Sequence, residues 1–403
     1  MRYLSRTSGT KGMIKSSPED FLVKEITANG FVLSPDVNYT AQEIGEQEIP
    51  NGKFVNLVVQ KRDWETINAL VTIAKRCNRG RKSISYAGTK DRRAVTVQLA
   101  SIFGVTPQAL QSVSIKDIKI NGAWKGNQVE LGSNLGNAFE VRITNAENAE
   151  NAGKIIEELN CRMPNYFGEQ RFGIRGNNAE IGMHIMRGEL ELAVMEFLTS
   201  TCNETSEKAI EARKKLADER DFSAAAKYFP RYLKAERTVI NELAKNEKDF
   251  ANALRKLPRG ILIMFIHAVQ SDIFNREVDE RIHCKDFSSE KNCAENFYGF
   301  PDVEKVSGEG KYAVTDIVGY DTKEEDMNDY CKNIIEELQL KPEEFKIKSM
   351  PELSMRGSCR PILVNAKDLN YSIDNEQKTV KLSFSLPSGS YATVLLNEMM
   401  KSV

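Results

Sequence analysis

The pattern of apolar and polar residues in the first 145 positions predicts a mixed α and β fold. Four segments are rich in β-branched and aromatic residues, as strands are. Between the second and the third, apolar residues three and four apart predict a helix over 66–75. The four predicted strands cover 21–26, 53–59, 94–99 and 139–143.

From about residue 146 the apolar spacing becomes that of long amphipathic helices. Residues 286–310 are polar and irregular, which is typical of a loop. Strand character returns only at 379–386. The predicted helices cover 149–161, 178–197, 206–216, 237–257 and 260–281.

Strands at both ends of the chain, around a helical middle, predict an α+β domain that both termini build, with a second domain inserted in it. The alternative is an α+β domain followed by an all-α domain, and the C-terminal strand argues against it. The length of 403 residues is enough for two or three domains.

The composition is that of a globular protein, with 41% hydrophobic and 28% charged residues. The net charge of −1 means that any affinity for nucleic acid must come from a local basic surface. No segment has the length and apolarity of a signal peptide or a membrane span. The seven cysteines are scattered without a CxxC pair, which predicts free thiols and a reducing, cytoplasmic compartment.

Motifs of nucleotide and metal chemistry are missing from the sequence. It contains no GxxxxGK[ST] phosphate loop and no GxGxxG that follows a predicted strand. Its cysteines and histidines do not have the spacing of a zinc site. We therefore expect no metal, nucleotide or redox cofactor.

The most concentrated charge lies in residues 75–93, which carry a net charge of +7. Such a run is often a solvated face, but Gly80 and Gly88 within it would allow a ligand to approach the backbone closely. A basic, glycine-containing segment is suited to binding the phosphates of a polyanion. The eight cations are Lys75, Arg76, Arg79, Arg81, Lys82, Lys90, Arg92 and Arg93.

The single acid in this segment is Asp91, which lies just before a predicted strand. Neighbouring cations favour the ionised form of a carboxyl group. An ionised carboxylate is a poor general acid, but it can act as a nucleophile, a base or an electrostatic anchor. Together with phosphate-binding cations, it indicates an enzyme that acts on the sugar or base of a nucleic acid. The alternative is a salt-bridged loop residue without chemistry.

Residues 85–96, SYAGTKDRRAVT, resemble the catalytic motif of the TruD family of tRNA pseudouridine synthases, in which G-x-K-D carries the aspartate. Further stretches match the family over nearly the whole chain, and several motifs in order are stronger evidence than any one alone. They are PEDF at 18–21 with Val23 and Glu25, LGNAF at 135–139, PNYFGEQRFG at 164–173, QSDIFN at 270–275 and LPSGSYAT at 386–393.

The resemblance implies an α+β fold: a pseudouridine-synthase catalytic domain with a mixed, mainly antiparallel sheet, interrupted by an inserted, largely helical α/β TRUD domain. Residues 1–166 and 364–403 would form the catalytic domain, and 167–363 the TRUD domain. The implied activity is isomerisation of uridine 13 of tRNA to pseudouridine, without a cofactor. The implied partner is tRNA; no membrane is expected and no protein partner can be inferred.

The resemblance also implies roles for individual residues. Asp91 would be the catalytic carboxylate, acting either by addition to the sugar carbon or by removal of a ribose proton. Extruding the uridine from the RNA stack costs a few kcal/mol, which stacking on aromatic rings can offset. Phe21, Phe139 and Tyr391 would supply these rings and Asn137 a polar contact, whereas the basic segment adds Lys90, Arg92, Arg79 and Arg81 as phosphate contacts.

Two other functions remain open from the sequence. The protein could be a non-catalytic RNA-binding protein or tRNA chaperone, or a pseudouridine synthase with other or broader RNA targets. A nuclease or glycosidase with paired acids is weaker, because no second carboxylate lies at a useful spacing from Asp91. The aromatic stretch 164–173 is expected to be a packed hinge rather than an RNA surface.

Overall fold

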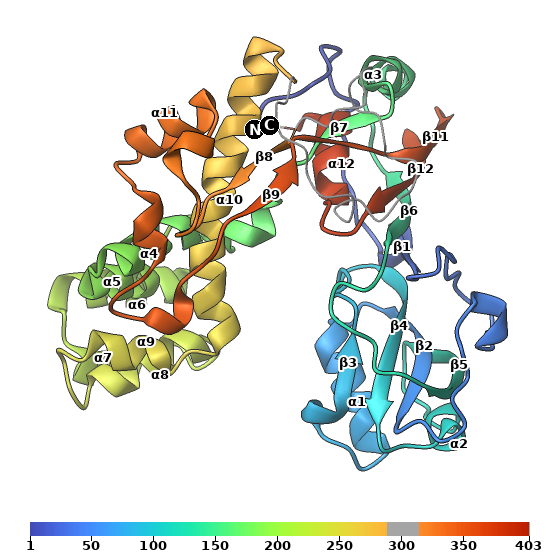
Figure 1. Cartoon of the computed structure of the whole chain (residues 1–403), viewed down its shortest axis with the longest axis horizontal. Coiled ribbons are helices and arrows are strands. Elements are labelled where there is room, and N and C mark those ends of the chain that lie inside the picture. Colours follow the sequence, from blue (N-terminus) through green and yellow to red (C-terminus); the bar gives the residue numbers. More distant parts are fainter. Residues whose placement is uncertain (288–313, 403) are drawn as a thin grey trace. The chain divides into compact units, whose positions relative to one another are not determined.

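A computed structural model describes residues 1–287 and 314–402 and divides them into two compact units (Figure 1). The sheet unit comprises residues 3–165 and 363–402, and the helical unit comprises 1–2, 166–287 and 314–362. Both halves of the sequence therefore contribute to the sheet unit. The predicted α+β class, with strands from both ends of the chain in one sheet, is confirmed.

The sheet unit contains a sheet of eight strands in the order β11-β12-β6-β1-β4-β2-β5, with β3 also paired to β4. The pair β1–β4 is parallel and the other pairs are antiparallel, so the sheet is mixed and mainly antiparallel as expected. The strands are β1 (Phe21–Ile26), β2 (Phe54–Arg62), β3 (Ile84–Tyr86), β4 (Val95–Phe103), β5 (Ile118–Gly126), β6 (Gly136–Ile143), β11 (Lys367–Asp374) and β12 (Thr379–Pro387).

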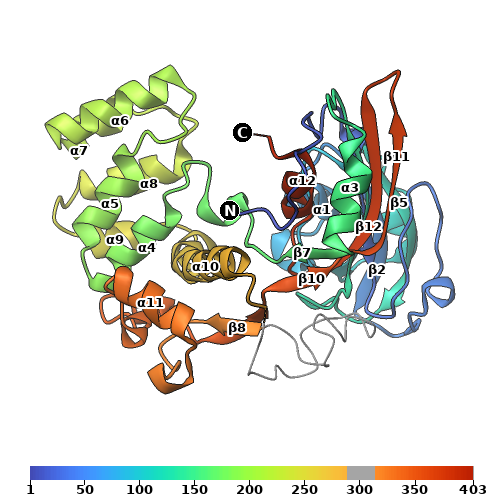
Figure 2. The ribbon, with the colours of Figure 1, turned by 90° about the horizontal axis from the view of Figure 1, so that it is seen from above.

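Helix α1 (Thr66–Arg76) covers one face of this sheet, because its apolar side chains pack on alternate residues of β2 and β4. Leu70 and Ile73 of the helix lie with Leu57 and Val59 of β2 in one buried cluster. The unit also contains α2 (Pro107–Gln111), α3 (Asn151–Leu159) and α12 (Ala392–Met400). Figure 2 shows α3 lying along β11 and β12.

The helical unit is built around α10 (Arg259–Cys284), whose apolar residues pack against α4 (Asn178–Arg187). The two helices approach closely at Gly182, where a Cβ atom would lie 2.3 Å from the carbonyl oxygen of Phe265. The other helices are α5 (Leu190–Thr199), α6 (Glu207–Glu219), α7 (Phe222–Tyr228), α8 (Lys234–Leu243), α9 (Phe250–Arg255) and α11 (Asp329–Glu337).

Two short strand pairs complete the fold within the described residues. In the sheet unit, β7 (Arg162–Pro164) pairs with β10 (Leu363–Asn365), so the segments on either side of the helical unit lie next to each other. In the helical unit, β8 (Val314–Ile317) pairs with β9 (Ser358–Pro361).

The structure corrects several predicted elements. The helix predicted over 178–197 is two helices, because Gly188 takes a left-handed conformation with φ of 77° and ends α4. The helix predicted over 237–257 is likewise divided into α8 and α9. Strands β5 and β11 were not predicted. The loop predicted over 286–310 falls almost entirely outside the described residues.

No helix among the described residues is long and apolar enough to span a membrane. Nor do these residues contain a group of three or more His, Cys, Asp and Glu side chains that could hold a metal ion. Cys359 is disulfide-bonded, so the prediction of free thiols throughout the chain is wrong at this position. Among the described residues, Cys77, Cys161, Cys202, Cys284 and Cys331 are not disulfide-bonded.

Candidate active site

Asp91 lies in a loop, residues 87–94, that connects β3 to β4 and has no regular secondary structure. Side chains from α1 and β4 hold this loop. Thr66, the first residue of α1, accepts a hydrogen bond from the Lys90 main-chain N–H at 2.9 Å. The Gln98 amide of β4 donates to the Gly88 carbonyl at 3.1 Å. The loop backbone is therefore fixed next to Asp91 by the sheet and its covering helix.

Two lysines contact Asp91 itself. The Lys15 ammonium donates to the Oδ1 atom of the carboxylate at 2.5 Å, and it also lies 4.2 Å from the centre of the Phe21 ring. The Lys61 ammonium donates to the Asp91 main-chain carbonyl at 2.8 Å. The Asp91 side chain remains 38% exposed, so a ligand can reach the carboxylate.

The cations adjacent to Asp91 in sequence have other partners. Lys90 forms a buried ion pair with Glu25 of β1, at 2.5 Å between Nζ and Oε2. Arg92 is exposed and lies 4.0 Å from Asp63, and Arg93 donates to the Ser16 carbonyl at 2.7 Å. The positive charge at the carboxylate therefore comes from Lys15, which the sequence analysis did not single out.

Lys61 is a second residue that the sequence analysis missed. It belongs to β2, has only 1% of its surface exposed, and follows Val55, Leu57 and Val59 on the buried side of the strand. Burial lowers the pKa of its ammonium to about 8, although the negative charges of Asp91 and Glu65 oppose this effect. A lysine in phase with three buried apolar residues is the signal that could have identified it.

Asn137 lies directly opposite Glu25 in the antiparallel pair of β6 and β1. Its Oδ1 atom is buried and has no hydrogen-bond partner among the described residues. Because Glu25 holds Lys90, the neighbour of Asp91, the sheet register brings the predicted residue Asn137 to the part of the sheet that supports the Asp91 loop.

The predicted aromatic residues differ in exposure. Phe21 and Phe139 are buried, with ring centres 6.2 Å apart, and Phe139 stacks on Phe384 at 5.2 Å. Tyr391 is only half-buried and directly precedes α12. Its loop is attached to the sheet where the main-chain N–H of Ser388 donates to the Leu135 carbonyl at 2.9 Å. Tyr391 therefore follows a loop anchored at the start of β6.

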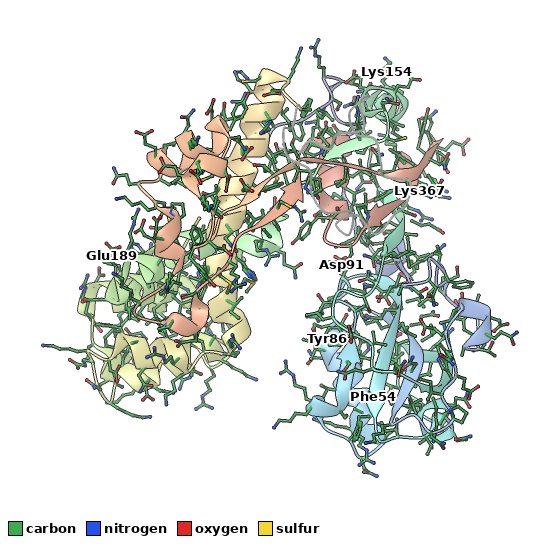
Figure 3. The ribbon with its side chains drawn as sticks, viewed as in Figure 1. Phe54, Tyr86, Asp91, Lys154, Glu189 and Lys367 are labelled. Atoms are coloured by element: carbon green, nitrogen blue, oxygen red, sulfur yellow. The ribbon has the colours of Figure 1, made fainter. Side chains whose placement is uncertain are left out.

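Arg79 and Arg81 lie at the other end of β4 from Asp91. The Arg79 guanidinium donates to the carbonyl of Gly104, the residue after β4, and Arg81 precedes β3. At roughly 3.3 Å per residue, the nine residues of β4 span about 26 Å. In Figure 3, Asp91 lies near one end of β4 and Phe54, the partner of Phe103, near the other. Both arginines are exposed, but they are not part of the Asp91 cluster.

Phe167 of the aromatic stretch 164–173 is half-buried and packs against α10. The Phe167 main-chain N–H donates to the Asn275 side chain at 2.8 Å, and its ring contacts Phe274 at 5.4 Å. The Arg360 guanidinium covers the same ring at 4.1 Å. Two of the sequence motifs, 164–173 and 270–275, thus pack on each other. That the stretch 164–173 forms a hinge stays a prediction.

The Asp91 cluster consists of the partly exposed Asp91 carboxylate, the Lys15 ammonium that contacts it, and the Lys61 ammonium that donates to the Asp91 main-chain carbonyl. Such a carboxylate can serve as a nucleophile or a base, and its loop is held in place by surrounding side chains.

Known proteins are similar to this chain in sequence and in fold over almost its entire length. The family model described as tRNA pseudouridine synthase D (TruD) matches residues 1–399. The probable tRNA pseudouridine synthase D of Methanosarcina acetivorans is 31% identical, with 99% of this chain and 95% of that protein covered. The probable tRNA pseudouridine synthase D of Archaeoglobus fulgidus is 32% identical, with 99% and 97% covered.

A solved structure agrees with these sequence relatives. The crystal structure of the Methanosarcina mazei protein named tRNA pseudouridine synthase D (TruD) superposes with a TM-score of 0.76 at 30% identity, and it covers 100% of this chain and 96% of that one. The family resemblance inferred from the motifs is therefore confirmed. The chain belongs to the TruD family of tRNA pseudouridine synthases, and it is a pseudouridine synthase, an isomerase that acts on tRNA.

Proposed function

We propose that the protein converts uridine 13 of tRNA to pseudouridine and that Asp91 is the catalytic carboxylate. In this reaction the bond between N1 of the base and the sugar breaks, the base turns, and C5 forms the new bond to the same sugar carbon. C5 then loses its proton and N1 gains one, so the product is an isomer of uridine. The observation that carries the proposal is the Asp91 carboxylate itself. It is partly exposed, bound by Lys15 and attached to a loop that α1 and β4 hold.

The proposal assigns the extruded uridine to the neighbourhood of Asn137 and Tyr391. Asn137 offers a buried oxygen that has no hydrogen-bond partner in the described part of the chain and could accept a hydrogen bond from the base or the ribose. Tyr391 is the candidate aromatic residue whose ring is not fully buried, and stacking on such a ring is worth about 1–3 kcal/mol per base. Phe21 and Phe139 would support the bound uridine from within the sheet, where their two rings are in contact.

The exposed arginines Arg79, Arg81 and Arg92 are proposed to bind phosphates of the tRNA. The Lys90 ammonium is buried on Glu25, so we assign it to the support of the loop as well as to the basic segment. Because Arg79 and Arg81 lie at the far end of β4, they would contact RNA at a distance from the modified nucleotide.

The test is an assay of the purified protein on unmodified tRNA transcripts, with pseudouridine mapped at each position. We expect pseudouridine at position 13 with the wild-type protein and none with Asp91→Asn, although tRNA binding is retained. Asp36→Asn is the matched control, because Asp36 is an exposed carboxylate in the same unit that pairs with Lys119. It should leave activity unchanged.

Each alternative gives a different result in this assay. Turnover by Asp91→Asn would reject the role of Asp91. Pseudouridine at other positions would reject the specificity for uridine 13 but keep the isomerase. Binding of tRNA by the wild-type protein without any pseudouridine would favour a chaperone.

A further inference from the structure

Lys61 is a buried charge in contact with the backbone of Asp91. It is the next-to-last residue of β2, and its ammonium donates to the Asp91 main-chain carbonyl at 2.8 Å. Within residues 1–287 and 314–402, no carboxylate oxygen lies within 4.0 Å of this ammonium. Its direct partner is therefore a neutral carbonyl group, and not a counter-ion.

This arrangement is unfavourable for folding. Removing an ammonium from water costs more than one hydrogen bond to a carbonyl returns, and a methionine of similar length would fill the same space without that cost. Charged groups that are buried in this way gather at functional sites more often than elsewhere. Lys61 combines this property with a contact to the residue proposed to carry the chemistry.

The two lysines restrain Asp91 at different atoms. Lys15 contacts the carboxylate, whereas Lys61 contacts the main-chain carbonyl. Thr66 fixes the peptide between Thr89 and Lys90 through the Lys90 N–H. The backbone is thus held at the Asp91 carbonyl and at the residue before Asp91, which limits how far the carboxylate can move. A displacement of 1 Å at a reacting group can lower a rate about 100-fold.

We propose that Lys61 is a positioning residue whose ammonium holds the main chain of Asp91 and thereby places the carboxylate at the sugar of the bound uridine. This inference rests on the proposed function, because it takes Asp91 as the reactive carboxylate. It gives β2 a function in the reaction as well as in the sheet.

The charge state of Lys61 connects this role to pH. Burial lowers the pKa of Lys61 to about 8, so its ammonium loses its proton near that pH. The charged groups around it are Asp91 and Lys90 in the loop, Glu65 at the start of α1 and Asp63 after β2. A neutral amine binds a carbonyl more weakly than an ammonium does. The rate of isomerisation should therefore fall as pH rises through about 8.

The experiment compares wild type, Lys61→Met and Lys61→Arg, with Lys119→Met as a matched control at an exposed lysine of the same unit. We would measure the single-turnover rate with saturating unmodified tRNA between pH 6.5 and 9, the Kd for tRNA, and thermal unfolding. Lys61→Met should unfold at no lower temperature and bind tRNA within about twofold of wild type. Its rate should fall about 100-fold and lose the alkaline decline.

Lys61→Arg should recover part of the rate and move the decline to higher pH, because a guanidinium stays charged throughout this range. A folded Lys61→Met with the wild-type rate would overturn the inference. If Lys61→Met does not fold, an Arg variant that declines at the same pH as wild type would overturn it. Asp91→Asn separates the two proposals: if that variant is active, the proposed function fails, and if it is inactive while Lys61→Met is fully active, this inference alone fails.

Discussion

The ion pair between Glu25 and Lys90 gives a sharp prediction about the stability of the Asp91 loop. The two charged groups lie 2.5 Å apart, and their side chains are 1% and 4% exposed. Glu25 also accepts a hydrogen bond from the Leu99 main-chain N–H at 2.9 Å. Removing either partner leaves the other charge buried, which typically costs about 3–5 kcal/mol.

The two single substitutions should not cost the same. Glu25 lines a cavity of about 200 Å³ together with Asn56 and Asn134, whereas Lys90 is not one of its lining residues. This volume has room for water, so the carboxylate that Lys90→Met leaves behind can be solvated. The ammonium that Glu25→Gln leaves behind belongs to Lys90, which does not line this cavity. At pH 7, neutralising an ordinary lysine by loss of its proton costs about 5 kcal/mol, and neutralising an ordinary carboxylate by protonation costs about 4 kcal/mol.

We therefore expect Glu25→Gln to destabilise the sheet unit by about 4 kcal/mol and Lys90→Met by about 2–3 kcal/mol. The double variant should cost no more than about 2 kcal/mol, because it leaves no charge without a partner. The free energy of unfolding would be measured in urea at pH 7 by tryptophan fluorescence. Both tryptophans, Trp64 and Trp124, lie in the sheet unit and so report on it directly.

The matched control is the pair Asp36 and Lys119, which also lie 2.5 Å apart but are 63% and 64% exposed. The same cycle of single and double substitutions there should show little or no coupling, because solvent screens the charges. If the cycle at Glu25 and Lys90 shows no more coupling than this exposed pair, the reasoning from burial is wrong.

The remaining predictions concern charge at and around the site. Lys15→Met should slow isomerisation at least about tenfold with tRNA affinity nearly unchanged in filter binding, since a hydrogen bond to a charged group is worth about 1.5–3 kcal/mol; an unchanged rate would contradict it. Replacing both Arg79 and Arg81 by Gln should reduce the slope of log K for tRNA binding against log salt concentration by about 1.5 in magnitude. An unchanged slope would mean that neither side chain contacts the RNA. The pKa of Lys61 is about 8 in the folded protein and 10.5 as its ordinary value. Between these pH values the folded state therefore binds fewer protons than the unfolded state. The contribution of Lys61 to the free energy of unfolding should rise with pH over this range by up to about 3 kcal/mol. Urea unfolding at pH 7.5 and 10 should show this rise in wild type but not in Lys61→Met.

Strands were predicted best where one face is buried and the other is polar. The predicted strand 21–26 coincides with β1, and 379–386 differs from β12 by one residue. By contrast, β11 is an edge strand with no buried residue, and it was not predicted although Leu369, Tyr371 and Ile373 alternate with polar residues along it. Burial shapes the apolar pattern of the sequence, and this pattern therefore identifies central strands more readily than edge strands.

The candidate site could be predicted only in part, for a different reason. Asp91 belongs to a local motif, which a sequence displays directly. Its partners Lys15 and Lys61 come from segments 76 and 30 residues away, and they reach Asp91 through the pairing of β1, β4 and β2. Lys90 and Arg92 are its neighbours in sequence, yet their charged groups pair elsewhere. Proximity along the chain therefore indicated the right kind of environment for Asp91 but the wrong cations.

The register of the sheet explains why motifs so far apart in sequence belong to one site. Lys61 of β2 pairs with Thr96 of β4, Thr96 with Val23 of β1, Val23 with Phe139 of β6, and Phe139 with Phe384 of β12. Residues paired in this way have their side chains on the same face, and a shift of one residue in any pair would move the following ones to the opposite face. This row of paired residues therefore begins at Lys61, which contacts the Asp91 loop, and ends at Phe384 in β12, the last strand of the chain. It follows that a one-residue insertion in β12 should disturb the aromatic end of the site while the loop around Asp91 remains in place, because side chains of α1 and β4 hold that loop.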